Sequence, residues 1–263
     1  MDWHGHLLLI HQTEQERRAG VSAWVSRGLG LGEKVVYLEP PDEPPSRSLV
    51  TVLTEQRVPI DDAAASGQVQ VLTADPAVCS AEGLADMVDQ AIGQGYPGVR
   101  LSGEAATAER VMPRAAHDDL ERATDLLCRT RPVSVLCQYP AERARQALPE
   151  VSAMHRDGVR EGLLQTARRP GGIVLRGEVD RSNHDILQGV LRAATLSATD
   201  ALVVDLSLLS FLDVSGARAL LAGTKDYRRG GGRVRLRWPQ HPVDRALDVC
   251  GVADAGGLQV DSS

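Results

Sequence analysis

The sequence has few aromatic residues and almost no lysine. Phe, Trp and Tyr together make up 3% of the 263 residues, and Phe occurs once. The lysines are Lys34 and Lys225, so arginine carries nearly all of the positive charge. A core built from such a chain must pack mainly aliphatic side chains. The length predicts two domains, and 43% hydrophobic with 24% charged residues is ordinary for globular proteins.

Features typical of secreted and membrane proteins are also missing. The beginning, MDWHGHLLLIH, has no basic region followed by a long apolar one, and no apolar run approaches the roughly 20 residues that span a bilayer. The cysteines lie far apart and form no CxxC pair; they are Cys79, Cys128, Cys137 and Cys250. We therefore expect a protein of the reducing cytoplasm with no membrane contact of its own.

The charge pattern does not indicate a nucleic-acid-binding protein. Residues 1–160 hold 16 basic and 23 acidic side chains, and residues 161–263 hold 13 and 12. Binding to a phosphate backbone needs a clustered positive excess. The nearest approach to one is a group of five arginines, several of which we expect to alternate along a strand and stay solvated: Arg228, Arg229, Arg233, Arg235 and Arg237.

Apolar runs of strand length alternate with helix-favouring stretches through the first 155 residues. This rhythm predicts parallel strands covered by helices. The expected strands are 5–11, 34–39, 68–74, 97–104 and 133–139, and the expected helices are 14–27, 48–56, 81–93 and 117–129.

The alternation of strands and helices ends after Met154, where charged residues mix with glycines. We therefore place the domain boundary near Gly162. The domains are then 1–161 and 162–263. The second is expected to contain strands at 173–180, 201–213 and 233–239, helices at 183–196, 215–228 and 242–251, and a last extended piece at 257–260.

The most informative stretch is ALVVDLSLLSFLDVSGARALLAG at 201–223, where a buried strand leads through Asp213 into a helix that begins near Ser215. The first backbone N–H groups of a helix are unpaired and its dipole is positive there, so negative charge is favoured by about 0.3 to 1 kcal/mol. A phosphate on Ser215 would therefore be tolerated. Gly216 would leave room for a kinase to approach. The alternative is that Asp213 or Ser215 merely caps the helix.

The second half resembles the STAS domain of anti-sigma factor antagonists over nearly all of 163–263. The resemblance rests on LRGEVD at 175–180 and on VVDLSLLSFLDVSGARALL, which is similar to the strand, Asp-Ser-Ser-Gly turn and helix of that family. It implies that a partner kinase, which doubles as an anti-sigma factor, phosphorylates Ser215 and that phosphorylation ends binding.

The same resemblance implies roles for the neighbouring residues. Asp213 would position the hydroxyl, and Val214 replaces the first serine of the usual pair, which leaves the phosphoacceptor in place. Asp180 and Val214 would contact the partner. Asp180 has an alternative reading as a simple turn residue.

The first half carries no GxxxxGK[ST] motif, which argues against a nucleotide hydrolase. The run Gly28-Leu29-Gly30-Leu31-Gly32 precedes a strand rather than opening a helix, so it is expected to be a helix exit rather than a phosphate-binding loop.

Residues 5 to about 155 resemble the MEDS sensory domain, which implies a RecA-like sheet without a phosphate loop and a role in sensing one-carbon or hydrocarbon-derived compounds. The stretches that carry the resemblance are GHLLLIH, QERRAGVSAWVSRGLGLGEKVVYL, GQVQVL, AIGQGYPGVRLSGE and VSVLCQYP, with His155. The sequence departs from the family at His117-Asp118, where Tyr-Glu is common, and at Arg156, where Pro is usual. Both departures affect whether this chain binds the same ligand as the other members of the family.

A ligand of this domain is expected beyond the carboxyl ends of the strands. The candidate ligand-binding residues are His6, Arg100, Glu104, Cys137, Tyr139 and His155. Arg100 and Glu104 could instead form a structural ion pair, and Cys137 could be an inert core thiol. His4 and His6 share a strand face, but no further ligand stands at ordered spacing, so no metal is assigned.

Together these features predict a cytoplasmic regulatory protein of two α/β domains, not an enzyme. The first domain, RecA-like without a P-loop, would set how readily the smaller STAS-type domain binds its anti-sigma kinase. The alternative is a small-molecule receptor that uses the STAS domain only for docking. The kinase would supply ATP, so no cofactor is expected. The sequence leaves open whether the protein forms a homodimer.

Overall fold

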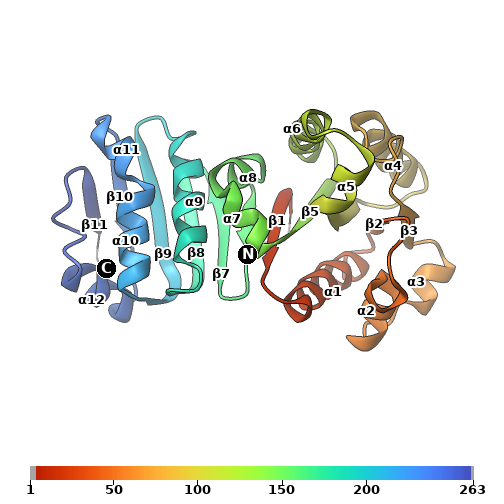
Figure 1. Cartoon of the computed structure of the whole chain (residues 1–263), viewed down its shortest axis with the longest axis horizontal. Helices are drawn as coiled ribbons and strands as arrows, with labels where there is room; N and C mark the ends of the chain where they lie inside the picture. The colour runs from red at the N-terminus through yellow and green to blue at the C-terminus, as the bar shows by residue number, and fades with distance from the viewer. Residues whose placement is uncertain (1–3, 262–263) are drawn as a thin grey trace. The chain divides into compact units, whose positions relative to one another are not determined.

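The computed structural model describes residues 4–261 (Figure 1). The chain forms two compact units, Met1–Ala141 and Glu142–Ser263. The sequence placed the boundary near Gly162, whereas the contacts place the stretch after Ala141 with the second unit. One reason is that α8 (Leu148–Met154) packs on α9 (His184–Thr195), where a Cβ on Gly189 would come within 2.7 Å of Leu148 Cβ.

The first unit contains a parallel five-stranded sheet. Its strands run in the order β1-β5-β4-β2-β3, and every neighbouring pair is parallel. The predicted alternation of strands and helices is therefore confirmed. The strands are β1 (His6–His11), β2 (Lys34–Glu39), β3 (Val69–Thr73), β4 (Val99–Glu104) and β5 (Val133–Pro140).

Helices cover both faces of this sheet because successive strand residues point to opposite sides. Val35 and Leu136 face a cluster that includes Trp24 of α1, whereas Val36 and Val135 face the opposite cluster. Figure 1 shows α1, α2 and α3 on one side and α4, α5 and α6 on the other. These helices are α1 (Glu14–Gly30), α2 (Leu49–Glu55), α3 (Asp61–Ala65), α4 (Ala81–Gly93), α5 (Ala105–Val111) and α6 (Arg114–Thr130), with a 3₁₀ turn at Pro45–Arg47.

The glycine run at 28–32 ends α1, as the sequence predicts. The helix continues to Gly30, and Gly32 adopts a φ of +71°, a conformation that favours glycine. Gly28 has a separate packing role, since a Cβ there would lie 2.7 Å from Arg100 Cδ and 2.8 Å from Val35 Cγ2.

The second unit contains a mixed sheet in the order β11-β10-β9-β8-β7-β6. The two hairpin-connected pairs, β6 with β7 and β7 with β8, are antiparallel, and the remaining pairs are parallel. The charged, glycine-containing stretch after Met154 supplies β6 and β7, which the sequence analysis left without structure. The strands are β6 (Gly158–Arg160), β7 (Leu164–Arg169), β8 (Gly172–Val179), β9 (Ala201–Leu212), β10 (Arg233–Arg237) and β11 (Leu258–Asp261).

The helix predicted at 215–228 is divided at Thr224, whose hydroxyl donates to Leu220 O at 2.8 Å. On β10, the arginines alternate with buried Val234 and Leu236, as expected. The remaining helices are α7 (Ala141–Gln146), α10 (Val214–Gly223), α11 (Lys225–Arg229) and α12 (His241–Val249). In the stretch 4–261, no helix combines the length and apolar character needed to cross a bilayer.

Candidate functional site

The serine turn lies where β9 ends and α10 begins. Asp213 is the N-cap, and its Oδ1 accepts a hydrogen bond from the Gly216 N–H at 2.8 Å. Its own N–H donates to Val179 O at 3.1 Å, which ties the turn to β8. The capping role considered for Asp213 is therefore present, and the carboxylate is engaged with the backbone.

Ser215 is the second residue of α10 and is half-buried, so its side chain reaches the surface. Val214, immediately before it, is 51% exposed. The strand runs out into a turn and a helix, as the sequence predicts, and Ser215 keeps part of its surface exposed.

Gly216 has a different role from the one expected. We expected its missing side chain to leave space for a kinase, but Gly216 is buried. A Cβ there would lie 2.5 Å from Leu212 Cδ1 and 2.9 Å from Val179 Cγ1. The glycine lets α10 pack onto the strands, so its position is explained by the core rather than by access to Ser215.

Asp180 follows β8 at the same sheet edge at which Asp213 follows β9, because Val179 and Leu212 are paired in register. Its carboxylate accepts from Ser182 N–H at 2.7 Å and from Ser182 Oγ at 2.6 Å. These hydrogen bonds lower the pKa of Asp180. Asp180 is therefore a turn residue at the edge that carries the serine turn.

The sequence analysis missed Asn183, which is fully buried beneath this turn. Its Oδ1 accepts from the Asp180 N–H at 3.0 Å, and its Nδ2 donates to Glu161 Oε2 and to Glu178 O, both at 3.1 Å. Its position three residues after Asp180 in DRSN was the available signal, since Asp and Asn favour such turns.

Exposed apolar side chains lie on β9 before the serine turn and within the turn itself. Leu208, Phe211 and Val214 are 47%, 46% and 51% exposed. Phe211 is paired in register with Glu178, two residues before Asp180. We call Asp180, Leu208, Phe211, Val214 and Ser215 the serine-turn surface.

The first unit holds a small cavity of about 70 Å³. Its walls are mostly apolar, from β2, β4, α4 and α6, and include Leu84, Leu101 and Leu120. Polar groups gather among the lining residues: Glu104, His117, Glu121 and Cys137. It begins near the carboxyl ends of β2 and β4, where a ligand was expected, and extends under the helices.

Among the predicted ligand-binding residues of the first unit, two meet in this region. Cys137 Sγ lies 3.5 Å from His6 Nε2, and Glu121 Oε2 lies 3.2 Å from the same nitrogen. Burial, followed by the charge of Glu121, raises the pKa of Cys137 well above its usual range. Burial, Glu121 and Cys137 together also raise the pKa of Tyr139. Glu121 was not predicted from sequence.

Arg100 does not join these residues. It is fully buried on the opposite face of the sheet, its guanidinium bonds to Glu33, and it lies 4.4 Å from the Trp24 ring centroid. The alternative pairing of Arg100 with Glu104 is therefore wrong, and the structure does not bring Arg100 together with His6 and Cys137. Arg100 lies near the amino end of β4, far along the strand from Glu104.

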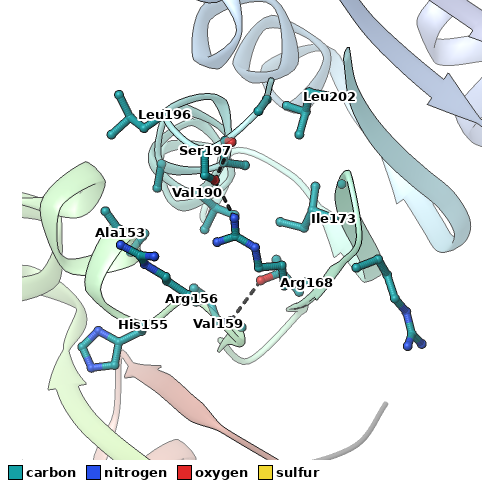
Figure 2. A pocket seen from close by; sticks show the side chains of 18 of the residues that line it. Ala153, His155, Arg156, Val159, Arg168, Ile173, Val190, Leu196, Ser197 and Leu202 are labelled. Carbon is teal, nitrogen blue, oxygen red and sulfur yellow. Dashed lines mark hydrogen bonds between the residues drawn. The ribbon is translucent and has the colours of Figure 1, made fainter. Parts of the chain in front are cut away.

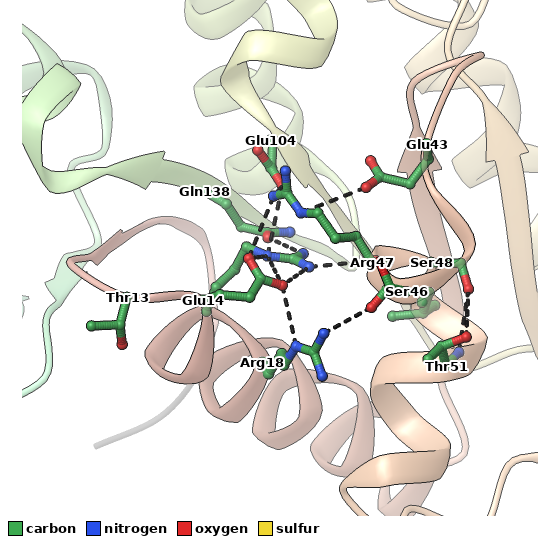
Figure 3. Close-up of polar contacts among 12 residues, drawn as sticks. Thr13, Glu14, Arg18, Glu43, Ser46, Arg47, Ser48, Thr51, Glu104 and Gln138 are labelled. Atoms are coloured by element: carbon green, nitrogen blue, oxygen red, sulfur yellow. Dashed lines mark hydrogen bonds and ion pairs between the residues drawn. The ribbon is translucent and has the colours of Figure 1, made fainter.

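Glu104 instead belongs to a polar network on the α1 face (Figure 3). Arg17, 1% exposed, donates to Glu14 Oε1 at 2.6 Å and to the Tyr37 hydroxyl at 3.0 Å, and lies 3.7 Å from Glu104. Gln138 donates to Tyr37 at 3.2 Å. Burial raises the pKa of Tyr37 to about 12. No sequence pattern singles out Arg17, which is one arginine of a polar helix.

Acidic side chains occupy the start of α1, where a P-loop protein would hold phosphate. Thr13 Oγ1 accepts from the Glu16 N–H at 3.2 Å, and Glu16 Oε2 accepts from the N–H of Gln12, the residue before the N-cap, at 2.7 Å. Glu14 follows the cap directly. These carboxylates would repel a phosphate group at this position.

A larger cavity of about 300 Å³ lies within the second unit (Figure 2). Arg168 reaches toward α9 there and donates to Ser197 Oγ at 2.6 Å. Arg156 and Arg169 also line it. His155, a predicted ligand residue, is buried at its wall, with Nδ1 2.8 Å from Val151 O.

Comparisons with known proteins match two separate stretches of the chain, which meet between residues 156 and 163. The family model for MEDS, the methanogen/methylotroph, DcmR sensory domain, matches residues 5–156, and the model for the Mlab, STAS domain matches residues 163–260. No curated protein matches the chain. One solved structure with some similarity is the anti-sigma factor antagonist SpoIIAA in its unphosphorylated form, at 20% identity over 38% of this chain and 89% of that one, with a TM-score of 0.31.

Proposed function

Because the chain belongs to the MEDS family and carries a STAS domain after its sensory domain, we propose that it is an anti-sigma factor antagonist-like regulator. In this proposal the serine-turn surface binds an anti-sigma factor that is also a serine kinase. Phosphorylation of Ser215 ends that binding. The first domain senses a small molecule and sets how readily the second is modified.

The observation that carries the proposal is the position of Ser215. It lies in the first turn of a ten-residue helix, half-buried, beside the exposed side chains of Val214 and Phe211. Exposed apolar residues next to polar groups are typical of a protein-binding surface. A partner that covers these side chains would therefore also cover the serine.

A phosphate at this position would act on the partner rather than on the fold. It adds about −1.5 to −2 charge at neutral pH, and the helix start tolerates that charge. Binding would then bury the new charge against Val214 and Phe211, which is costly unless a cation pairs with it. Modification would thus weaken binding without unfolding the STAS domain.

The chain itself would catalyse no reaction in this scheme, since the partner kinase supplies ATP and Mg²⁺. The regulator would act in the cytoplasm, where such kinases meet sigma factors. Control of the second domain by the first is inferred from their fusion in one chain.

Phosphotransfer with anti-sigma kinases from the same genome tests the assignment. Wild type, Ser215→Ala and Ser210→Ala are incubated with kinase and labelled ATP. Ser210 is the matched control, an exposed serine on β9 whose hydroxyl donates to Gly177 O at 2.9 Å. We expect label on wild type and Ser210→Ala and none on Ser215→Ala. Equal labelling of Ser215→Ala would show that the phosphorylated residue lies elsewhere.

A second candidate function is a small-molecule receptor that uses the STAS domain only for docking. The cavity of the first unit favours it, because apolar walls with a few polar groups are typical of ligand sites. Its volume would admit on the order of five water-sized groups. A one-carbon compound or another small hydrocarbon derivative with an oxygen atom would fit these walls.

Calorimetric titration with short alcohols, aldehydes and chlorinated methanes tests the receptor. Ala108 lines the cavity, whereas Ala106 on the same helix does not, so Ala108→Leu and Ala106→Leu form a matched pair. Binding should be lost in Ala108→Leu and kept in Ala106→Leu. Equal affinities in both variants would place the ligand outside this cavity.

A further inference from the structure

Three metal-ligating side chains from distant parts of the sequence converge inside the first unit. His6 begins β1, Glu121 lies on α6 and Cys137 lies on β5. Their ligand atoms all lie within 4.8 Å of one another. His6 and Glu121 are buried, at 0% and 5% exposure, and Cys137 is partly buried.

The distances match those between ligands around one tetrahedral metal ion. Zinc bonds of about 2.0–2.1 Å to N or O and about 2.3 Å to S place N and O about 3.3 Å apart and N and S about 3.6 Å apart. In the protein, His6 Nε2 is 3.2 Å from Glu121 Oε2 and 3.5 Å from Cys137 Sγ. The cluster therefore has the dimensions of a coordination shell.

Hydrogen bonds also connect these groups, since the Cys137 thiol bonds to Glu121 as well as lying near His6 Nε2. An imidazole Nε2 offers one in-plane position, either a proton or a lone pair. Here both the carboxylate oxygen and the sulfur approach that same nitrogen. A cation at their common centre would use one lone pair from each of the three atoms.

We propose that His6, Glu121 and Cys137 bind a divalent transition-metal ion, with zinc as the best fit. Thiolate and imidazole ligands select zinc over magnesium and calcium, which prefer shells made of oxygen. His117 supports the site from the next shell, because its Nε2 lies 3.3 Å from the second Glu121 oxygen, Oε1. Such outer partners orient the ligand carboxylate.

With these three ligands alone, the ion would keep an open position. Three protein ligands with a fourth position for water or substrate are typical of zinc sites that act on small molecules. Glu121, Cys137 and His117 all line the apolar cavity, so the open position would face it. An alcohol, aldehyde or carboxylate oxygen could then bind the metal while its hydrocarbon part contacts the apolar walls. This last step rests on the receptor function proposed above, whereas metal binding itself does not.

Metal analysis of the full-length protein tests the site. Purified protein is stripped with chelator, reloaded with Zn²⁺ and desalted, and the bound zinc is measured by mass spectrometry. Loading with Co²⁺ in parallel reports thiolate ligation through the sulfur-to-cobalt charge-transfer band in the near ultraviolet. The variants are Cys137→Ser, Glu121→Gln and His6→Asn. Cys250→Ser is the control, a partly buried cysteine of the second unit.

We expect one zinc per chain in wild type and in Cys250→Ser, with the charge-transfer band present in both. Cys137→Ser should lose the band, and Glu121→Gln and His6→Asn should hold zinc at least about ten-fold more weakly. Wild type that retains no stoichiometric zinc, or a band of full intensity in Cys137→Ser, would overturn the proposal. If Cys137→Ser does not fold by circular dichroism, zinc affinity in the other two variants decides. A zinc-loaded protein that binds no small ligand would contradict only the receptor function.

Discussion

Gly216 and Leu212 lie in direct contact across the serine turn, and a Cβ on Gly216 would come within 2.5 Å of Leu212 Cδ1. The turn that presents Ser215 is therefore held by packing beneath it as well as by the Asp213 cap above it.

Gly216→Ala should destabilise the STAS domain by about 1 to 3 kcal/mol, because the added methyl group overpacks a full core. Gly230→Ala is the control, since a Cβ there would meet its nearest atoms at 3.4 and 3.5 Å, an ordinary contact. Urea unfolding followed by circular dichroism measures both. Equal stability of the two variants would mean that the contact with Leu212 relaxes without cost.

Asp213→Ala should cost about 0.5 to 2 kcal/mol of stability through loss of the N-cap bond to the Gly216 N–H. Asp213→Asn keeps an oxygen that can accept this bond and should cost less. The urea midpoints of the two variants give the comparison. If Asp213→Asn and Asp213→Ala lose the same stability, the charge of Asp213 rather than its capping hydrogen bond stabilises the turn.

Phe211→Asp and Val214→Asp should weaken binding to the anti-sigma partner at least about ten-fold, since each places a charge in a contact that must be desolvated. Val249 on α12 is 78% exposed, and Val249→Asp makes the same chemical change away from the serine turn. Surface plasmon resonance with the partner should show that Val249→Asp binds like wild type. An equal loss of partner binding in all three variants would show that the interface does not lie at the serine turn.

Tyr37→Phe should destabilise the first unit by about 1 to 3 kcal/mol, because it removes the hydroxyl that meets Arg17 at 3.0 Å and leaves buried polar groups without a partner. Tyr96→Phe is the control, since Tyr96 contacts Lys34 through its ring, which Phe retains. Thermal unfolding of both variants measures the difference. Similar melting temperatures would show that water replaces the Tyr37 hydroxyl.

Stability should fall as the pH is lowered through 6.5, in part because of His11. Burial, opposed by Glu104, lowers the pKa of this buried imidazole in the folded state. Between the folded pKa and 6.5 the unfolded chain binds a proton that the folded chain does not, so the free energy of unfolding decreases with acid and levels off below the folded pKa.

His11→Asn should flatten that pH dependence. Urea midpoints of wild type and His11→Asn at pH 7.5, 6.5 and 5.5 measure it, and the difference between them should change most between the last two. Parallel curves for the two proteins would mean that His11 takes up its proton equally in both states.

Local patterns in the sequence were enough to predict most of the helices and strands. Alternating apolar runs gave the five parallel strands of the first unit, and the Asp-Val-Ser-Gly turn after a buried strand gave the start of α10, because these features depend on neighbours along the chain. Local patterns failed at β6 and β7. The charged residues there form strands because β7 pairs with β8 and β6 pairs with β7.

The sequence by itself therefore determined the two α/β domains and the serine at a helix start. Only the tertiary structure decided that Arg100 pairs with Glu33, that Gly216 serves the core, and that His6, Glu121 and Cys137 share one centre. The physical reason is distance along the chain: a strand, a helix and another strand bring these three atoms together only when the sheet order is set, and no local spacing records that order.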